Sequence, residues 1–280
     1  MNNLTGVIPS TFGNLSTLTI LNKARTQISG EIPIELGCLI NLVTLQLSEN
    51  QLSGEIPFSI FNISSLKFIS LTLNRQVGKL PSNIGLTLPK IRELCLASNH
   101  LEGPIPSSLS NASYIEHLDL SSYNFTGHIP LLASLKDWKC TKTLCPYQLR
   151  KLFFKGKIPN SIGKFQKLER LMVIDNLFSG EILDIFSNLT WLYELDMANN
   201  RLSGRIPMSK ATCQQLEMLV LAWTALNGSI PKQIFELPQL KFLLLANNSL
   251  SGFLPNEFGH LRQLEIMKFL ETSYMEIFLQ

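Results

Sequence analysis

Apolar residues return along this chain at fixed places in a repeating unit. The tetrapeptide Gly-x-(Ile/Val/Leu)-Pro marks each unit, and successive copies begin 24 residues apart except for one interval of 25 and one of 29. The copies begin at Gly6, Gly30, Gly54, Gly78, Gly103, Gly127, Gly156, Gly180, Gly204, Gly228 and Gly252, with Leu183 in place of proline in the copy at Gly180. A repeat of this length is typical of solenoids.

The unit at residues 30–54 shows how the apolar positions divide. Leu45, Gln46 and Leu47 alternate with a period of two, which predicts a short strand with both leucines inside and Gln46 outside. Further leucines at every third residue before the strand reach the same core from the returning side. Because no unit can bury these leucines alone, we predict an α/β solenoid with a parallel concave β-sheet and a convex side of 3-10 turns and loops.

An asparagine follows the strand in most units, where the chain turns. We predict that these side chains bond backbone groups of adjacent coils and form a ladder. The ladder positions are Asn2, Asn50, Asn74, Asn99, Asn176, Asn200 and Asn248. Thr26, Tyr123 and Thr224 replace asparagine, and Lys23 replaces the second strand leucine. Threonine can still accept one bond there, whereas Tyr123 does not fit the ladder, so these coils should be weaker.

The repeat register divides the chain into four segments. Residues 1–126 and 156–262 form two blocks of repeats. Residues 127–155 have no Leu-x-Leu-x-x-Asn pattern and are interpreted as a degenerate repeat that bulges or interrupts the solenoid. Residues 263–280 are a divergent tail in which the pattern decays.

Composition and motifs argue against several classes of function. The net charge is only +3 and no like charges cluster, so nothing suggests nucleic acid or an anionic membrane as partner. No apolar run reaches the roughly 18–20 residues that span a bilayer. The four histidines lack zinc-ligand spacing, and the catalytic strings of kinases and Gly-x-Ser-x-Gly are absent. We therefore expect no metal, no cofactor and no enzyme activity; any kinase domain would lie in another portion of the protein.

Glycosylation motifs indicate the secretory pathway, although the first residues lack the pattern of a signal peptide. Several of the Asn-x-Ser/Thr sites share one place in the repeat, so their glycans would line one side of the solenoid. The predicted acceptors are Asn3, Asn14, Asn62, Asn111, Asn124, Asn188, Asn227 and Asn247.

The five cysteines have different expected roles. Cys140 and Cys145 lie in the irregular segment and would either form a disulfide or remain two free thiols. Cys38 and Cys213 are predicted to fill core space, and Cys95 to face outward from a strand.

Particular strings extend this picture to a family. IFNISSLKFISLTLN, LASLKDW (ending at Trp138) and NRLSGRIPMSKATCQQLEMLVLA resemble ectodomains of plant leucine-rich-repeat receptor kinases, in the subfamily of the flagellin and elongation factor Tu receptors. The Leu-Ser-Gly-Glu-Ile-Pro motif is similar to the plant-specific class of leucine-rich repeat. The resemblance implies a superhelical fold, a plasma-membrane receptor facing outward, a role in immune perception, a microbial peptide or protein ligand and a co-receptor kinase. Because the usual caps, membrane span and kinase domain are missing, we interpret the sequence as a fragment or truncated product.

The outward residues of the strands form the predicted ligand-binding surface. The middle of this surface is polar and partly acidic, and an apolar patch lies toward its C-terminal end, which suits a peptide or a partner protein. The candidate residues are Phe68, Glu93, His117, Asp119, Arg170, Met172, Glu194, Asp196, Met218, Val220, Trp223, Phe242 and Leu244. A secreted inhibitor of microbial cell-wall enzymes and a non-functional remnant are the alternatives to a receptor ectodomain.

Overall fold

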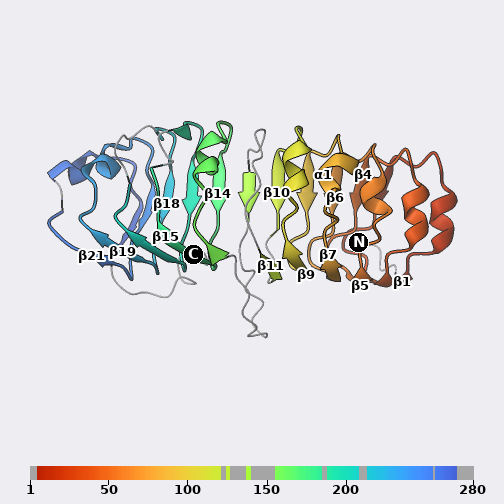
Figure 1. Ribbon diagram of the computed structural model, residues 1–280. Coiled ribbons are helices and arrows are strands. Elements are labelled where there is room, and N and C mark those ends of the chain that lie inside the picture. Colours follow the sequence, from red (N-terminus) through yellow and green to blue (C-terminus); the bar gives the residue numbers. More distant parts are fainter. Residues whose placement is uncertain are drawn as a thin grey trace. The chain divides into compact units, whose positions relative to one another are not determined.

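The computed structural model describes residues 5–120, 124–126, 137–139, 155–184, 188–207, 213–254 and 256–269 (Figure 1). The chain divides into two compact units, Met1–Lys155 and Gly156–Gln280. Within the described residues, no helix is long and apolar enough to cross a membrane.

Each coil of the first unit contributes one short strand to a primary parallel sheet. These strands are β2 (Ile20–Asn22), β4 (Thr44–Gln46), β6 (Phe68–Ser70), β8 (Glu93–Cys95), β10 (His117–Asp119) and β12 (Asp137–Lys139), and they pair in that order. Helical turns on the returning side are η1 (Ser10–Asn14), η2 (Ile34–Cys38), η3 (Ile60–Asn62), α1 (Ile84–Thr87) and η4 (Ser107–Asn111).

The second unit repeats this arrangement. Its primary strands are β14 (Arg170–Met172), β16 (Glu194–Asp196), β18 (Met218–Val220), β20 (Phe242–Leu244) and β22 (Ile266–Lys268), again parallel and paired in order. The 3-10 turns of this unit include η5 (Asn160–Lys164), η7 (Lys232–Glu236) and η8 (Asn256–His260). The predicted solenoid of parallel strands and 3-10 turns is confirmed.

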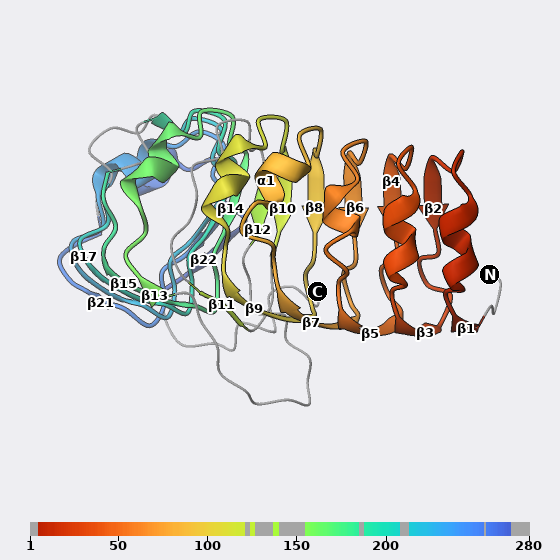
Figure 2. The same ribbon diagram turned by 45° about the vertical axis from the view of Figure 1, so that its right-hand side comes forward.

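Both units also carry a second parallel sheet, which the sequence interpretation missed. In the first unit it consists of β1 (Gly6–Val7), β3 (Ile28–Glu31), β5 (Gln51–Glu55), β7 (Arg75–Lys79), β9 (His100–Pro104) and β11 (Asn124–Thr126). The other sheet consists of β13 (Lys155–Gly156), β15 (Leu177–Glu181), β17 (Arg201–Gly204), β19 (Ala225–Gly228) and β21 (Ser249–Leu250). Figure 2 shows the second strands of the first unit along one edge, away from the helical turns.

The core of each coil is formed by the leucines that the repeat predicts. In the coil of residues 30–54, the five leucines at positions 36, 39, 42, 45 and 47 are 0% exposed. The same positions are buried in the following coils, for example at Leu66, Ile69 and Leu71. Since each coil packs on the next, its apolar surface is removed from water only within the stack.

The asparagine ladder between coils is confirmed at Asn50, Asn74, Asn99, Asn200 and Asn248. The Asn99 Oδ1 accepts the Gln76 N–H at 3.0 Å, and its Nδ2 donates to the carbonyls of Leu71 (2.9 Å), Leu96 (3.0 Å) and Ala97 (3.2 Å). Bonds of the same kind are made by Asn50, Asn74, Asn200 and Asn248. The Asn176 Nδ2 donates to the Val173 and Ile174 carbonyls of its own coil. Asn2 and Tyr123 lie outside the described residues.

The threonines in the ladder act as donors, a role that the sequence analysis did not predict. The Thr26 Oγ1 donates to the Lys23 carbonyl at 2.7 Å, and the Thr224 Oγ1 donates to the Leu221 carbonyl at 3.1 Å. Each hydroxyl therefore takes the place of the asparagine amide as a donor to its own coil.

Glycine is required at the second strand for two reasons. Gly54 has a φ of +77°, a conformation that disfavours side chains. A Cβ at Gly54 would also lie only 2.9 Å from the Glu31 Cγ of the preceding coil. Because Glu31 follows Gly30 in its own coil, the residue after each such glycine packs over the glycine of the next coil.

The irregular segment is partly described and contains a strand. Strand β12 pairs in register with β10, and Trp138 lies opposite Leu118. The primary sheet of the first unit therefore includes a strand from residues 127–155, where the sequence interpretation expected only a bulge or an interruption.

Candidate ligand-binding face

The first and third residues of each primary strand form two columns on the outer side of the sheet, which we call the strand face. In the first unit, Phe68, Glu93 and His117 are neighbours in the first column, in register on β6, β8 and β10. In the second column, Ser70, Cys95 and Asp119 are aligned on the same three strands. The two columns bring together the four candidate residues that the sequence placed in this unit.

Burial agrees with an outward orientation for these residues. Phe68, Glu93, His117 and Asp119 are half-buried, whereas the leucine or isoleucine between the outward residues of each strand is fully buried. Side chains that are partly covered by neighbours, with one side open, can contact a ligand while holding a fixed direction.

Ion pairs bridge successive coils along the edges of the strand face. The Arg25 Nη2 lies 2.8 Å from the Glu49 Oε1, and the Arg92 Nη1 lies 3.2 Å from the Glu116 Oε1. Arg92 and Glu116 directly precede β8 and β10. Both pairs are largely exposed, so they contribute little to stability but neutralise charges beside the columns.

In the second unit, Arg170 joins the candidate residues Glu194 and Met172 on the strand face. The Arg170 Nη1 lies 3.9 Å from the Glu194 Oε2, and its guanidinium is 6.0 Å from the centre of the Tyr193 ring. Tyr193 was not among the candidates; an aromatic residue directly before a strand carrying Glu194 was the signal that could have revealed it.

The prediction of an exposed apolar patch in the second unit is wrong. Met218, Val220 and Leu244 are 9%, 0% and 2% exposed and form one cluster with Ala198. Partly buried apolar side chains pack against this cluster: Ile174, Phe242 and Ile266. Matching positions on adjacent parallel strands lie about 4.8 Å apart, so large apolar side chains there pack on one another and leave water.

Two further candidates in this unit are not exposed side chains of the strand face: Asp196 is buried, and Trp223 lies in a turn. Asp196 is 2% exposed, and its Oδ1 accepts the Ala198 N–H at 3.0 Å. It is therefore not available to a ligand. Trp223 is 41% exposed but lies in the turn after β18, with a φ of +56°, which is unusual for a bulky residue.

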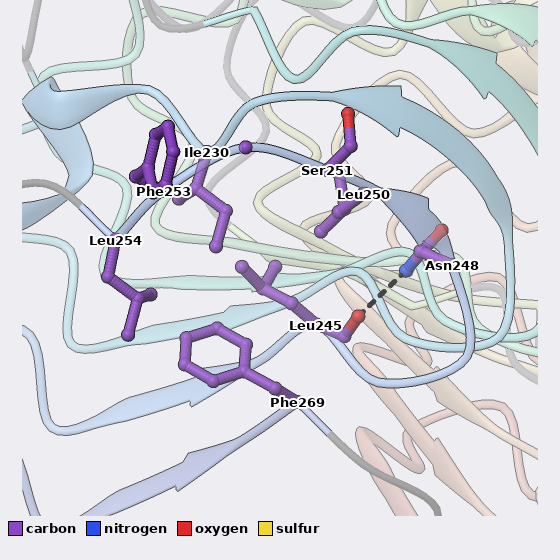
Figure 3. A pocket seen from close by; sticks show the side chains of 9 residues that line it. Ile230, Leu245, Asn248, Leu250, Ser251, Phe253, Leu254 and Phe269 are labelled. Atoms are coloured by element: carbon purple, nitrogen blue, oxygen red, sulfur yellow. Dashed lines mark hydrogen bonds between the residues drawn. The ribbon is translucent and has the colours of Figure 1, made fainter.

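A small cavity lies near β20 and β21. It has a volume of about 190 Å³, and its lining includes Leu245, Leu250, Phe253 and Phe269 (Figure 3). The polar Asn248 beside it is engaged, because its Nδ2 donates to the Leu245 carbonyl at 3.0 Å. Pockets for small molecules usually measure about 300–1,000 Å³ and converge several polar groups, so this cavity is a weak candidate.

No group of three or more His, Cys, Asp or Glu side chains that could hold a metal occurs among the residues that the structure describes.

The cysteines correct one prediction and confirm another. Cys38 is exposed at the end of η2, whereas we expected it in the core. Its position in the repeat matches Asn14, Asn62 and Asn111, which end the corresponding turns and point to solvent. Cys213 is buried as predicted, and burial, with a smaller effect of the Asp184 carboxylate, raises its thiol pKa to about 11. Cys140 and Cys145 lie outside the described residues.

The glycosylation motifs fall on two kinds of site. Asn14, Asn62, Asn111 and Asn188 are exposed at the 3-10 turns, and Asn227 is exposed on β19. At Asn247, the Nδ2 that would carry a glycan is buried and has no hydrogen-bond partner. The prediction for Asn247 is therefore wrong for the folded chain. Asn3 and the side chain of Asn124 lie outside the described residues.

We expect secreted chains to carry glycans at Asn62 and Asn111 and essentially none at Asn247. A glycan on Asn247 would have to bring its buried Nδ2 to the surface, which breaks the turn beside the ladder residue Asn248. Mass spectrometry of peptides from the chain secreted by plant cells would measure each occupancy. Substantial occupancy at Asn247 in folded, secreted protein would contradict this placement.

Comparison with known proteins agrees with the geometry. The family model described as Leucine Rich Repeat matches residues 41–63, 90–112, 191–211 and 239–261. No curated protein sequence matches the chain.

Solved structures with the same fold include ectodomains of plant membrane receptors. The plant peptide hormone receptor RGFR1, in complex with RGF2, is 35% identical with a TM-score of 0.87 over 94% of this chain and 41% of its own. Arabidopsis HAESA, in complex with the peptide hormone IDA and the co-receptor SERK1, is 34% identical with a TM-score of 0.82 over 94% of this chain and 43% of its own. The Arabidopsis thaliana receptor kinase GASSHO1/SCHENGEN3, in complex with CASPARIAN STRIP INTEGRITY FACTOR 2, is 31% identical with a TM-score of 0.78 over 94% of this chain and 34% of its own.

These matches show the fold of the chain. The chain is built from leucine-rich repeats and has the fold of plant leucine-rich-repeat receptor ectodomains. It spans less than half the length of each of these three solved chains.

Proposed function

We propose that this chain is an extracellular, non-catalytic ligand-binding part of a plant plasma-membrane receptor, either a receptor kinase or a receptor-like protein. The observation that carries the proposal is the strand face of the first unit. Phe68, Glu93, His117 and Asp119 differ in chemistry, are half-buried and lie in register over a core made almost entirely of leucine and isoleucine. Such a row of varied side chains on a rigid sheet suits an extended peptide or a protein segment.

The solved relatives support a peptide as the ligand. RGFR1 and HAESA were solved with the peptides RGF2 and IDA, and HAESA also with the co-receptor SERK1. By analogy, a co-receptor kinase would be a second partner of this chain.

The particular role that we propose is immune sensing of a microbial peptide or protein. Its support is the resemblance of the strings at residues 60–74 and 132–138 to the subfamily of the flagellin and elongation factor Tu receptors. The exposed acceptors Asn14, Asn62 and Asn111 are consistent with a glycosylated extracellular surface at the 3-10 turns.

The test is binding of peptide fractions to the chain secreted from plant cells. The immobilised chain is exposed to low-mass peptide fractions from bacterial cultures and from plant extracellular fluid, each before and after protease digestion. We expect protease-sensitive binding from the bacterial fraction. It should fall about tenfold or more in the double variant His117→Ala, Asp119→Ala.

Each outcome of this experiment bears on a separate part of the proposal. The control variant Phe58→Ala removes a side chain that is 61% exposed just before η3, away from the strand face, and should bind normally. Binding from the plant fraction alone would refute the immune role but keep a peptide receptor. Absence of protease-sensitive binding from both fractions would refute the peptide-binding function.

A further inference from the structure

Glu93 occupies an unusual place on the strand face of the first unit. It is half-buried on β8, with Phe68 in register on one side and His117 on the other. Across the part of the chain that the structure describes, no lysine, arginine or histidine forms an ion pair with it. The adjacent Arg92 is engaged, since its Nη1 lies 3.2 Å from the Glu116 Oε1.

The second unit shows what a carboxylate at this position can hold. Glu194 is the first residue of its primary strand, as Glu93 is of β8. There the preceding coil supplies Arg170, whose Nη1 lies 3.9 Å from the Glu194 Oε2 and whose guanidinium stands 6.0 Å from the Tyr193 ring centre. In the first unit, the residue in register from the preceding coil is Phe68. The carboxylate and an aromatic ring are thus present at Glu93, but among the described residues no arginine stands in register beside it as Arg170 does beside Glu194.

We propose that Glu93 and Phe68 form a subsite for a cationic side chain of the bound peptide, with arginine favoured over lysine. This inference rests on the proposed peptide-binding function and specifies, in addition, that one residue of the ligand is positively charged. A guanidinium can donate two parallel hydrogen bonds to a carboxylate and also stack on an aromatic face, whereas an ammonium is a compact, more strongly hydrated charge. Since Glu93 is partly covered by its neighbours, water screens this contact less than it screens an exposed pair.

The experiment selects displayed random peptides on the secreted chain and on the variant Glu93→Gln. We expect arginine, and to a lesser extent lysine, at one fixed position of peptides selected on the unchanged chain. That preference should disappear on Glu93→Gln. We then replace this arginine by citrulline in a selected peptide. The citrulline peptide should bind the unchanged chain about tenfold more weakly than the arginine peptide does, whereas Glu93→Gln should bind both peptides equally.

A matched control separates this site from general charge effects. Glu116→Gln removes a carboxylate one coil away that Arg92 already neutralises, so the arginine preference should persist. Equal melting temperatures of the two variants and the unchanged chain would show intact folding.

The outcomes distinguish this subsite from the function that it rests on. Selected peptides without a basic preference would overturn the subsite and leave peptide binding in place. A preference that survives in Glu93→Gln, or that Glu116→Gln equally abolishes, would overturn the assignment to Glu93. Failure to select any peptide would count against the proposed function and against this inference with it.

Discussion

Replacing Gly85 by alanine is expected to destabilise the first unit by about 3 kcal/mol or more, among the largest effects of any single methyl group in this chain. A Cβ at Gly85 would lie 1.9 Å from the Ser108 carbonyl oxygen and 2.7 Å from the Leu109 Cα. Both atoms belong to the backbone of η4 in the next coil, which cannot move without separating the two coils. The Gly85 N–H also donates to the Ser108 Oγ at 3.2 Å, so a shift would lose this bond.

The cause of this effect is close approach alone, because Gly85 does not have a positive φ. A Cβ added at Gly13 or Gly37 would also clash with the following coil, at 2.4 Å from the Glu35 carbonyl oxygen and 2.2 Å from the Ser59 Cβ, respectively. Glycine at the helical turns therefore sets the spacing between coils on that side of the stack.

Urea unfolding followed by circular dichroism, with hydrogen exchange to assign the loss to the first unit, would measure the effect. Gly259→Ala is the control, since no atom lies within 4 Å of a Cβ there, and its free energy of unfolding should change by less than about 0.5 kcal/mol. Equal stability of the Gly85 variant and the unchanged chain would mean that the coils are not packed at this spacing.

Much of the fold could be predicted from the sequence because the same residue type recurs at the same structural position in many coils. The buried Leu45 and the ladder bonds of Asn99 follow from positions that recur in coil after coil. The second sheets were missed because their strands contain the glycine that begins each repeated tetrapeptide, and we interpreted that glycine only as the marker of a unit. Strand β12 was missed because Asp137–Lys139 has tryptophan, not Leu-x-Leu, at its centre.

The sequence predicted which side of the sheet the candidate side chains face, but not how deeply they are buried. A period of two tells which side of a sheet a residue faces, and it placed Glu93 and His117 correctly. It does not tell what covers that side, so Val220, which is 0% exposed, was taken for a surface residue. Cys38 shows the opposite error, since an apolar residue was assigned to the core although its register matches exposed asparagines.

Replacing the ladder residue Asn99 by alanine is expected to cost about 3 kcal/mol of stability. Asn99 is 1% exposed, and its loss would remove the bonds of the buried Gln76 N–H and the Leu96 carbonyl. The Leu71 and Ala97 carbonyls would also lose a bond, but they keep a second donor, the Asn74 Nδ2 and the Leu73 N–H. Each unpaired buried group costs on the order of 1–3 kcal/mol, although small shifts and entering water recover part of the sum.

The chain itself supplies the graded comparison for this prediction. Thr26 stands at a ladder position and keeps only one side-chain bond to its own coil, to the Lys23 carbonyl. The loss of stability in Asn99→Thr should therefore be about a third smaller than the loss in Asn99→Ala. As a control, Asn41→Ala removes one exposed bond, from Nδ2 to the Ser16 carbonyl at 2.9 Å, and should cost less than about 1 kcal/mol. If urea unfolding placed Asn99→Ala level with Asn41→Ala, the ladder would be a consequence of the stacking and not one of its causes.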